Sequence, residues 1–184
     1  MICWQASDRC VLHRCVFLDR DGVINEKIPG GYVTRWEQFR WRRDAIVGLS
    51  LLQAAHFPLI IVSNQACVGK GMLDEAGLVG IMENMRWSLG SHGINLTAWY
   101  CCPHAPEVIC SCRKPGTAML QAAARDFGLD LAECHLLGDS LSDMEAARAA
   151  GCKAHFVDPA LDDSLSAAVL GIVGDLRVST AVYP

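Results

Sequence analysis

The sequence predicts an α/β fold of three layers, in which a parallel β-sheet lies between two layers of helices. Two observations favour this fold class. Short apolar runs alternate along the chain with longer segments in which apolar residues recur every three to four positions. This repeated strand–helix alternation is typical of parallel sheets that carry helices on both faces. The 184 residues are also enough to bury a substantial core in one domain.

Five short apolar runs are predicted to form the strands. In chain order they are residues 15–18, 59–62, 96–100, 134–137 and 154–157. These runs are rich in residues that favour β-strands.

Four segments are predicted to form helices, namely residues 44–55, 74–89, 117–127 and a segment that starts at Ser142 and ends before Gly151. The second of them places five apolar residues on one face: Leu78, Ile81, Met82, Met85 and Leu89. Gly128 is a stop signal for the third helix. The spacing of Ser142 to Glu145 fits a capping box and sets the predicted start of the fourth.

The composition is that of a globular protein and argues against two classes of partner. With 52% hydrophobic residues, 20% charged residues and a net charge of −4, the chain has no excess of basic residues for nucleic acid. No apolar run approaches the roughly 20 residues that span a bilayer, and the first residues lack the apolar region of a secretion signal. We expect a cytoplasmic monomer with one domain over residues 1–184, including an N-terminal extension (1–13) and a loop (26–43) that folds over the site.

The pair Asp19 and Asp21 is the most informative feature of the sequence. It follows the first predicted strand and precedes Gly22, where the backbone can turn. Side chains two positions apart on an extended chain point to the same side, so both carboxylates are expected to face one pocket. One can attack a substrate or hold a metal ion while the other transfers a proton. A lone Asp-x-Asp-Gly segment is also typical of an ordinary turn.

Further polar residues follow other predicted strands. Ser63, Asn64 and Gln65 come after the second strand, and Asp139 comes after the fourth. Ligands bind beyond the carboxyl ends of the strands in open α/β sheets, so these residues are expected to meet at one edge. Their joint occurrence favours an active site over unrelated turns. For Asp143 two roles stay open, a partner of the helix dipole and a support for a metal site.

Ten cysteines are present, and several cluster between positions 101 and 112. Three thiolates and one imidazole complete a tetrahedral zinc site with no open position, which predicts a structural metal. The candidate ligands are Cys102, His104, Cys110 and Cys112, with Cys101 as an alternative to Cys102. The remaining cysteines are expected to act as small hydrophobic residues: Cys3, Cys10, Cys15, Cys67, Cys134 and Cys152.

Four motifs occur in order: Asp19-Arg-Asp21-Gly, Ser63-Asn64-Gln65, Arg113-Lys114-Pro115 and Gly138-Asp139-Ser140-x-x-Asp143. Through them the chain resembles the haloacid dehalogenase (HAD) superfamily of phosphatases from about residue 15 to residue 157. The cysteine–histidine signature resembles the zinc-containing branch with the D-glycero-D-manno-heptose 1,7-bisphosphate 7-phosphatases and the histidinol-phosphate phosphatases, whose pattern selects Cys102 over Cys101. The resemblance implies a Rossmann-like HAD fold with a minimal cap and a zinc-bound loop at about 101–115.

The resemblance also implies a role for each catalytic residue. Asp19 would attack phosphorus and form an aspartyl-phosphate, and Asp21 would donate and then accept a proton. Asp19, Asp139 and the backbone carbonyl of Asp21 would hold Mg²⁺, a hard ion that prefers oxygen ligands. Ser63, with Asn64, would hydrogen-bond the phosphoryl oxygens, and Lys114 would balance their charge and position Asp19.

Ten positions match substrate-binding residues of the family: Gly30, Gly31, Tyr32, Ser63, Asn64, Gln65, Ala66, Arg113, Lys114 and Ser140. Among them, Arg113 matches the residue that recognises a distal phosphate, a task that suits a guanidinium group. The implied reaction removes the 7-phosphate of heptose 1,7-bisphosphate in the biosynthesis of nucleotide-activated heptose. Alternatives are the hydrolysis of histidinol phosphate or of another small sugar phosphate and, in a different class, a catalytically silent zinc-containing binding protein.

Overall fold

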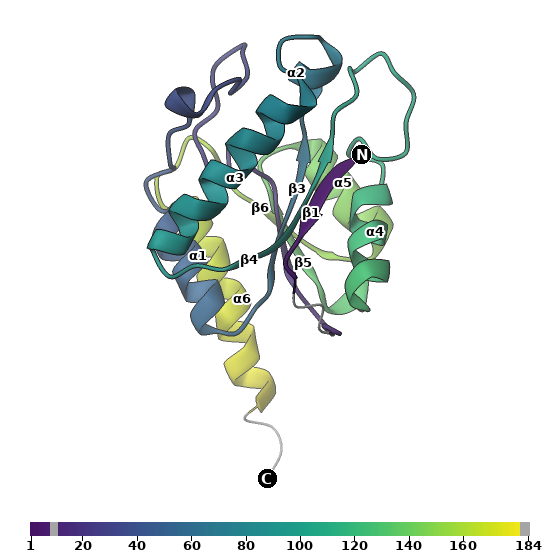
Figure 1. Cartoon of the computed structure of the whole chain (residues 1–184). Helices are drawn as coiled ribbons and strands as arrows, with labels where there is room; N and C mark the ends of the chain where they lie inside the picture. Colours follow the sequence, from purple (N-terminus) through teal and green to yellow (C-terminus); the bar gives the residue numbers. More distant parts are fainter. Residues whose placement is uncertain (8–10, 181–184) are drawn as a thin grey trace.

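The computed structural model of the chain describes residues 1–7 and 11–180 and has an α/β architecture (Figure 1). Its six-stranded sheet has the order β1-β4-β3-β2-β5-β6. The strands are β1 (Ile2–Gln5), β2 (Val16–Leu18), β3 (Leu59–Asn64), β4 (Leu96–Cys102), β5 (His135–Gly138) and β6 (Lys153–Phe156). Strands β2 to β6 pair in parallel and confirm the five predicted strands, whereas β1 pairs with β4 in the antiparallel direction.

Helices cover both faces of the sheet, which confirms the three-layer fold. One face carries α1 (Ala45–Ala54), α3 (Glu75–Ser91) and α6 (Ser164–Thr180), and the other carries α4 (Ala118–Phe127) and α5 (Leu141–Ala150) (Figure 1). Three short helical segments complete the described part of the chain: α2 (Ala66–Gly69), η1 (Trp36–Gln38) and η2 (Leu131–Glu133).

Successive side chains of the central strands point into opposite layers, which buries the sheet on both faces. Leu18 and Ile61 pack against α1, α3 and α6, while Phe17 and Ile60 belong to the core under α4 and α5. All four side chains are fully buried. Burial of each is worth roughly 1.5–3 kcal/mol, so this double-sided core fixes the strand ends on which the site is built.

Besides the three short helical segments, the prediction omits two elements, β1 and α6. Strand β1 is only four residues long and lies at the sheet edge, and its apolar run Ile2-Cys3-Trp4 is too short to identify a strand by itself. Helix α6 has a clear signal, because Leu165, Val169 and Ile172 recur at helical spacing and pack into the core over α1.

The predicted start of α5 is wrong. The capping box is formed by Ser140 and Asp143, not by Ser142 and Glu145. Ser140 has the extended backbone of an N-cap residue, with φ −132° and ψ 157°, because it directly follows β5 and Asp139. The helix therefore begins at Leu141, closer to the end of the strand than predicted.

Among the cysteines outside the 101–112 cluster, four are buried and confirm the expected hydrophobic role: Cys15, Cys67, Cys134 and Cys152. Cys3 contradicts it, because this residue lies on the edge strand β1 and is exposed. Cys10 lies outside the described residues.

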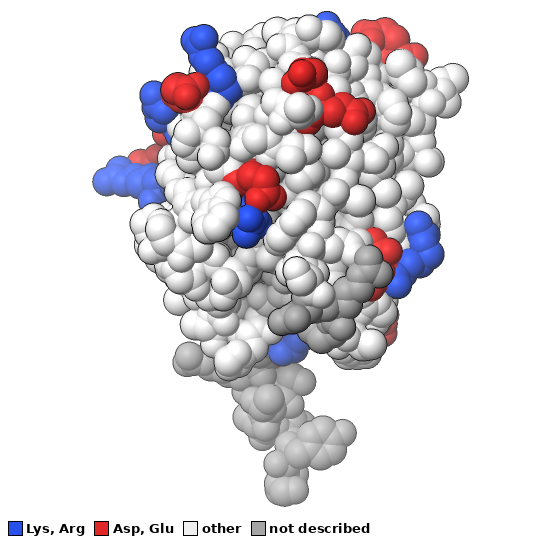
Figure 2. Space-filling view, viewed as in Figure 1, with Lys and Arg blue, Asp and Glu red and all other residues white. Residues whose placement is uncertain are grey.

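The surface agrees with the modest net charge. On the face shown in Figure 2, the Lys and Arg side chains of the described residues stand apart and form no continuous basic area. None of the helices in the described part of the chain combines the length and the apolar character that a bilayer-spanning segment needs.

Candidate active site

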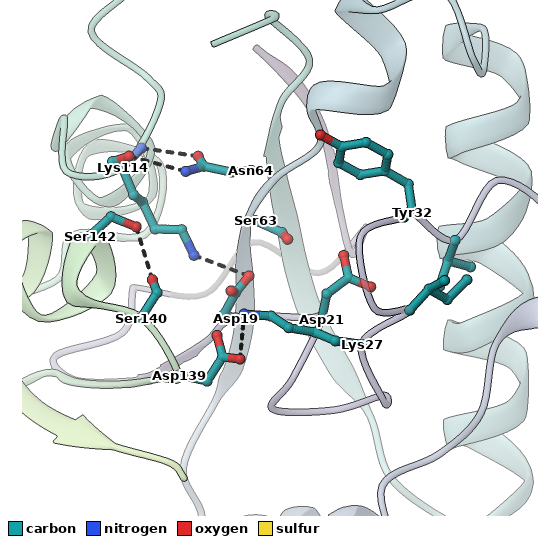
Figure 3. Close-up of a pocket in the computed structure, with 13 residues that line it drawn as sticks. Asp19, Asp21, Lys27, Tyr32, Ser63, Asn64, Lys114, Asp139, Ser140 and Ser142 are labelled. Carbon is teal, nitrogen blue, oxygen red and sulfur yellow. Dashed lines mark hydrogen bonds and ion pairs between the residues drawn. The ribbon is translucent and has the colours of Figure 1, made fainter. Parts of the chain in front are cut away.

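A cavity of about 220 Å³ opens where the carboxyl ends of β2, β3 and β5 meet (Figure 3). Asp19 directly follows β2, Ser63 lies at the end of β3, and Asp139 directly follows β5. The residues that line the cavity are Asp19, Asp21, Lys27, Ile28, Gly31, Tyr32, Val33, Ser63, Asn64, Lys114, Asp139, Ser140 and Ser142. Residues from all four motifs therefore meet in one place.

Asp19 and Lys114 form an ion pair at the floor of the cavity. Nζ of Lys114 lies 3.1 Å from Oδ1 of Asp19 and 2.5 Å from Oδ1 of Asp143, and it donates a hydrogen bond to the carbonyl of Val62 at 2.8 Å. Burial opposes the charge of Lys114, but the two carboxylates raise its pKa above the ordinary value. Burial raises the pKa of Asp19 to about 6, although Lys114 acts in the opposite direction.

Asp21 is held by donors on several sides. Nη2 of Arg20 lies 3.0 and 2.8 Å from the two carboxylate oxygens, and the amides of Asn25 and Gln65 donate at 2.8 and 2.9 Å. Burial alone would raise the pKa of Asp21, but Arg20 and the amide donors outweigh it and hold the pKa below the ordinary value. Arg20 is itself fully buried, so this carboxylate has a fixed orientation toward the cavity.

Asp19, Asp139 and Asp143 make an acidic cluster suited to a divalent cation. One oxygen of each carboxylate lies within 4.8 Å of the others. Oδ1 of Asp139 is buried without a hydrogen-bond donor among the described residues, so it is available to a metal ion. Gly22, with φ +95°, comes so close that a Cβ there would lie 1.9 Å from Oδ2 of Asp139. These oxygens fit the preference of Mg²⁺ for hard ligands.

The open question about Asp143 is answered in part by its contacts. Its Oδ2 accepts hydrogen bonds from the backbone N–H of Ser140, at 3.1 Å, and from Oγ of Ser140, at 2.5 Å. Its Oδ1 forms the ion pair with Lys114. Asp143 therefore caps α5 and also orients the ammonium group of Lys114 beside Asp19.

Ser63 and Asn64 both line the cavity, but their side chains have different surroundings. Oγ of Ser63 accepts a hydrogen bond from Gln65 at 3.0 Å. Asn64 forms a reciprocal pair with the backbone of Lys114, in which its amide donates at 3.1 Å and its carbonyl oxygen accepts at 3.0 Å. Asn64 therefore fixes the segment that delivers Lys114 to Asp19.

The remaining predicted substrate-binding residues divide into two groups. Gly31, Tyr32 and Ser140 line the cavity, whereas the lining does not include Gly30, Gln65, Ala66 or Arg113. Nη2 of Arg113 donates a hydrogen bond to the carbonyl of His104, so its guanidinium lies against the cysteine-rich loop.

The sequence-based prediction misses Lys27, whose Nζ lies 2.5 Å from Oδ2 of Asp139 (Figure 3). Lys27 belongs to the 26–43 loop, which has little regular structure and supplies four other lining residues: Ile28, Gly31, Tyr32 and Val33. The prediction that this loop folds over the site is therefore confirmed. The position of Lys27 was not predicted, because hydrophobic periodicity does not reveal the path of an irregular loop.

The cysteine–histidine cluster forms a compact set at the end of β4. Sγ of Cys110 lies 3.7 Å from Sγ of Cys102 and 3.8 Å from Sγ of Cys112. Nδ1 of His104 lies 3.4 and 3.3 Å from the sulfurs of Cys102 and Cys112. A tetrahedral ion with Zn–S bonds of about 2.3 Å separates its sulfur ligands by about 3.8 Å, so the four side chains fit zinc.

Cys101 does not belong to this set. Successive residues of β4 face opposite layers, so Cys101 lies in the core with α1, α3 and α6, while Cys102 lies on the other face. The opposite direction of its side chain therefore excludes Cys101 from the cluster.

The chain is similar to several characterised proteins. Residues 111–163 match the family described as HAD-hydrolase-like. D-glycero-β-D-manno-heptose-1,7-bisphosphate 7-phosphatase from Photorhabdus laumondii is 37% identical over 139 residues, which cover 72% of this chain and 73% of the relative. The Escherichia coli K12 enzyme of the same name is 37% identical over 142 residues, 73% of each chain.

A solved structure extends this similarity to the fold. D,D-heptose 1,7-bisphosphate phosphatase from B. bronchiseptica, complexed with magnesium and phosphate, superposes with a TM-score of 0.74 at 32% identity. The match covers 79% of this chain and 80% of that protein.

Proposed function

The chain belongs to the D-glycero-β-D-manno-heptose-1,7-bisphosphate 7-phosphatase family of HAD-like hydrolases, and from this premise we propose its reaction. It is a Mg²⁺-dependent phosphomonoesterase that removes the 7-phosphate of D-glycero-β-D-manno-heptose 1,7-bisphosphate. The single observation that carries the proposal is the ion pair between Asp19 and Lys114, which lies beside Asp139 in a cavity at the carboxyl edge of the sheet.

In the first step, a carboxylate oxygen of Asp19 attacks phosphorus, the bond between phosphorus and the sugar oxygen breaks, and an aspartyl-phosphate forms. Asp21 donates a proton to the leaving sugar oxygen. The contacts of Asp21 favour its ionised form, but the charge of a bound phosphate group nearby raises the pKa of a carboxyl group and supports protonation.

In the second step, a water molecule attacks the phosphorus of the aspartyl-phosphate, and Asp21 accepts the proton of that water. The bond between phosphorus and Asp19 breaks, which releases phosphate and restores the carboxylate. Arg20, Asn25 and Gln65 keep Asp21 aimed at the same point in both steps, so one residue can serve as acid and then as base.

Charge balance in the cavity comes from two sources. Asp19, Asp139 and the backbone carbonyl of Asp21 would hold Mg²⁺, which would shield the attacking carboxylate from the negative phosphate. Lys114 balances the charge of Asp19 and of the phosphoryl oxygens, and Oγ of Ser63 is available to donate to one of them. The magnesium in the B. bronchiseptica relative supports this metal.

A structural zinc ion is the second metal of the proposal. Its ligands would be Cys102, His104, Cys110 and Cys112, which leave no position open for substrate. The zinc would order the loop between the end of β4 and Lys114. Arg113, which precedes Lys114 on that loop, would bind the second phosphate of the substrate after its guanidinium leaves the carbonyl of His104.

The decisive experiment measures phosphate release in Mg²⁺ over a panel of heptose, hexose and histidinol phosphates. We expect the heptose bisphosphate to give the highest kcat/KM, and Asp19→Asn to lose activity at least a thousandfold. A higher kcat/KM for histidinol phosphate would show that this compound, and not the heptose bisphosphate, is the substrate. Equal inactivity of the wild type and Asp19→Asn over the whole panel would instead support a silent binding protein.

A further inference from the structure

Lys27 is a cavity residue to which the proposed mechanism gives no role. Its Nζ lies 2.5 Å from Oδ2 of Asp139, and its side chain crosses the cavity below Asp21 to reach that carboxylate (Figure 3). The side chain of Lys27 is 48% exposed, whereas that of Asp139 has no exposed area. The contact therefore joins a solvent-accessible cation to a buried carboxylate of the acidic cluster.

This contact places Lys27 in competition with a metal ion. Asp139 contributes one of the three carboxylates whose oxygens lie within 4.8 Å of one another. A divalent ion held by Asp139 would lie within a few ångströms of an ammonium group that stayed in contact with the same carboxylate. Repulsion between single charges about 4 Å apart is worth about fivefold in affinity even in water, and more in a partly buried site.

The two lysines of the cavity differ in their freedom to move. Lys114 is 2% exposed and is fixed by Asp19, Asp143 and the carbonyl of Val62. Lys27 has a single ion pair among the described residues and a long flexible side chain. Lys27 can therefore leave Asp139 at low cost, while Lys114 cannot leave its partners.

A second cavity offers Lys27 an alternative position. This cavity, of about 270 Å³, shares Lys27 with the active-site cavity and is also lined by Glu26, Arg42, Arg43 and Asp162. Asp162 already pairs with Arg43 at 2.8 Å, so the exposed carboxylate of Glu26 is the partner that the ammonium group can take after it moves away from Asp139.

We propose that Lys27 is an internal counter-ion of Asp139 that a divalent metal must displace, so that Lys27 sets the metal affinity of the active site. The proposal rests on the proposed Mg²⁺-dependent function. Without the ammonium group the acidic cluster would bind the metal more tightly, because no competing cation would have to leave.

The test is a titration of the full-length protein with Mn²⁺ alone, in which the free ion is measured by electron paramagnetic resonance. Lys27→Met removes the charge but keeps most of the side-chain volume, and Lys27→Arg keeps the charge. Lys153→Met is the matched control, because Lys153 forms an exposed pair with Glu133 away from the cavity. Displacement of bound Mn²⁺ by Mg²⁺ gives the affinity for the second metal.

We expect Lys27→Met to bind both metals at least about fivefold more tightly than the wild type, and Lys27→Arg and Lys153→Met to match the wild type. Wild-type affinity in Lys27→Met would overturn the role of Lys27 and leave the proposed phosphatase intact. Tighter binding in Lys27→Arg as well would overturn the role of its charge. Absence of metal binding in every protein, the wild type included, would overturn both this proposal and the Mg²⁺-dependent function.

Discussion

The side-chain amide of Gln65 donates a hydrogen bond to Oδ2 of Asp21 at 2.9 Å, although Gln65 lies outside the cavity lining. The same amide donates to Oγ of Ser63 at 3.0 Å. Gln65 thus connects Asp21, the proposed acid–base residue, with Ser63, a proposed phosphate-binding residue, from outside the cavity lining. We therefore interpret it as a positioning residue rather than as a residue in contact with substrate.

Gln65→Met tests this interpretation, because it keeps the volume of the side chain and removes the donor. We expect kcat to fall roughly tenfold, since a misdirected Asp21 transfers its proton less often. Loss of a donor to the carboxylate also raises the pKa of Asp21. Because Asp21 must be protonated when it donates to the leaving sugar oxygen, the basic side of the pH–kcat/KM profile should move to higher pH. The control is Gln121→Met on the exposed side of α4. An unchanged kcat and profile would show that Asp21 needs no support from Gln65.

Asp143 should be more important for stability than its partner in the capping box. Ser140→Ala removes one cap and should lower the free energy of unfolding by about 1 kcal/mol. Asp143→Ala removes the cap and also one of the two carboxylates beside buried Lys114, so we expect a loss of about 3 kcal/mol. Urea denaturation of both variants measures the difference. Equal losses would mean that the pair with Lys114 adds nothing to stability.

The fold could be predicted from the sequence because burial on both faces leaves a strong pattern. The central strands β2 and β3 are continuous apolar runs, and α3 has an apolar face. Edge strand β1 has only the short apolar run Ile2-Cys3-Trp4 and is not fully buried. Its antiparallel direction depends on pairing with β4, which no local signal encodes.

The candidate site was predictable where a residue directly follows a strand, as Asp19 and Asp139 do. The strand end fixes the backbone there, so position in the sequence translates into position in space. Lys27 and Arg113 belong to irregular segments, whose side chains reach their partners along paths that depend on the whole fold. The sequence therefore indicates the chemistry of the site better than its access and specificity.

Removal of zinc should disorder a loop rather than unfold the protein. The cluster joins the end of β4 to the segment before Lys114, while the sheet is held by cores on both of its faces. We expect Cys110→Ser to lose zinc by elemental analysis, to increase hydrogen exchange over residues 103–115, and to lower kcat, with exchange in β2 and β5 unchanged. Protein purified without chelators that contains no zinc would overturn the assignment of this metal.

His135 and His155 should make the protein less stable in acid. Nδ1 of His135 lies 2.9 Å from Nε2 of His155. Burial, and then the charges of His155 and Lys153, lower the pKa of His135 to about 4, although Asp175 acts in the opposite direction. The pKa of an unfolded histidine is about 6.5, so the unfolded chain binds more protons between these values and stability is lost as the pH falls through this window.

We expect the free energy of unfolding to fall by on the order of 2 kcal/mol more in the wild type than in His135→Gln between pH 7.5 and pH 4.5. The glutamine keeps polar atoms at the site but does not titrate, so its own cost is present at both pH values and cancels in the comparison. Urea denaturation at each pH provides the measurement. His92→Gln, at an exposed position after α3, should retain the wild-type dependence. If the free energy of unfolding depends on pH in the same way in the wild type and in His135→Gln, other groups cause the acid sensitivity. A difference between the two proteins requires that the fold keeps His135 neutral.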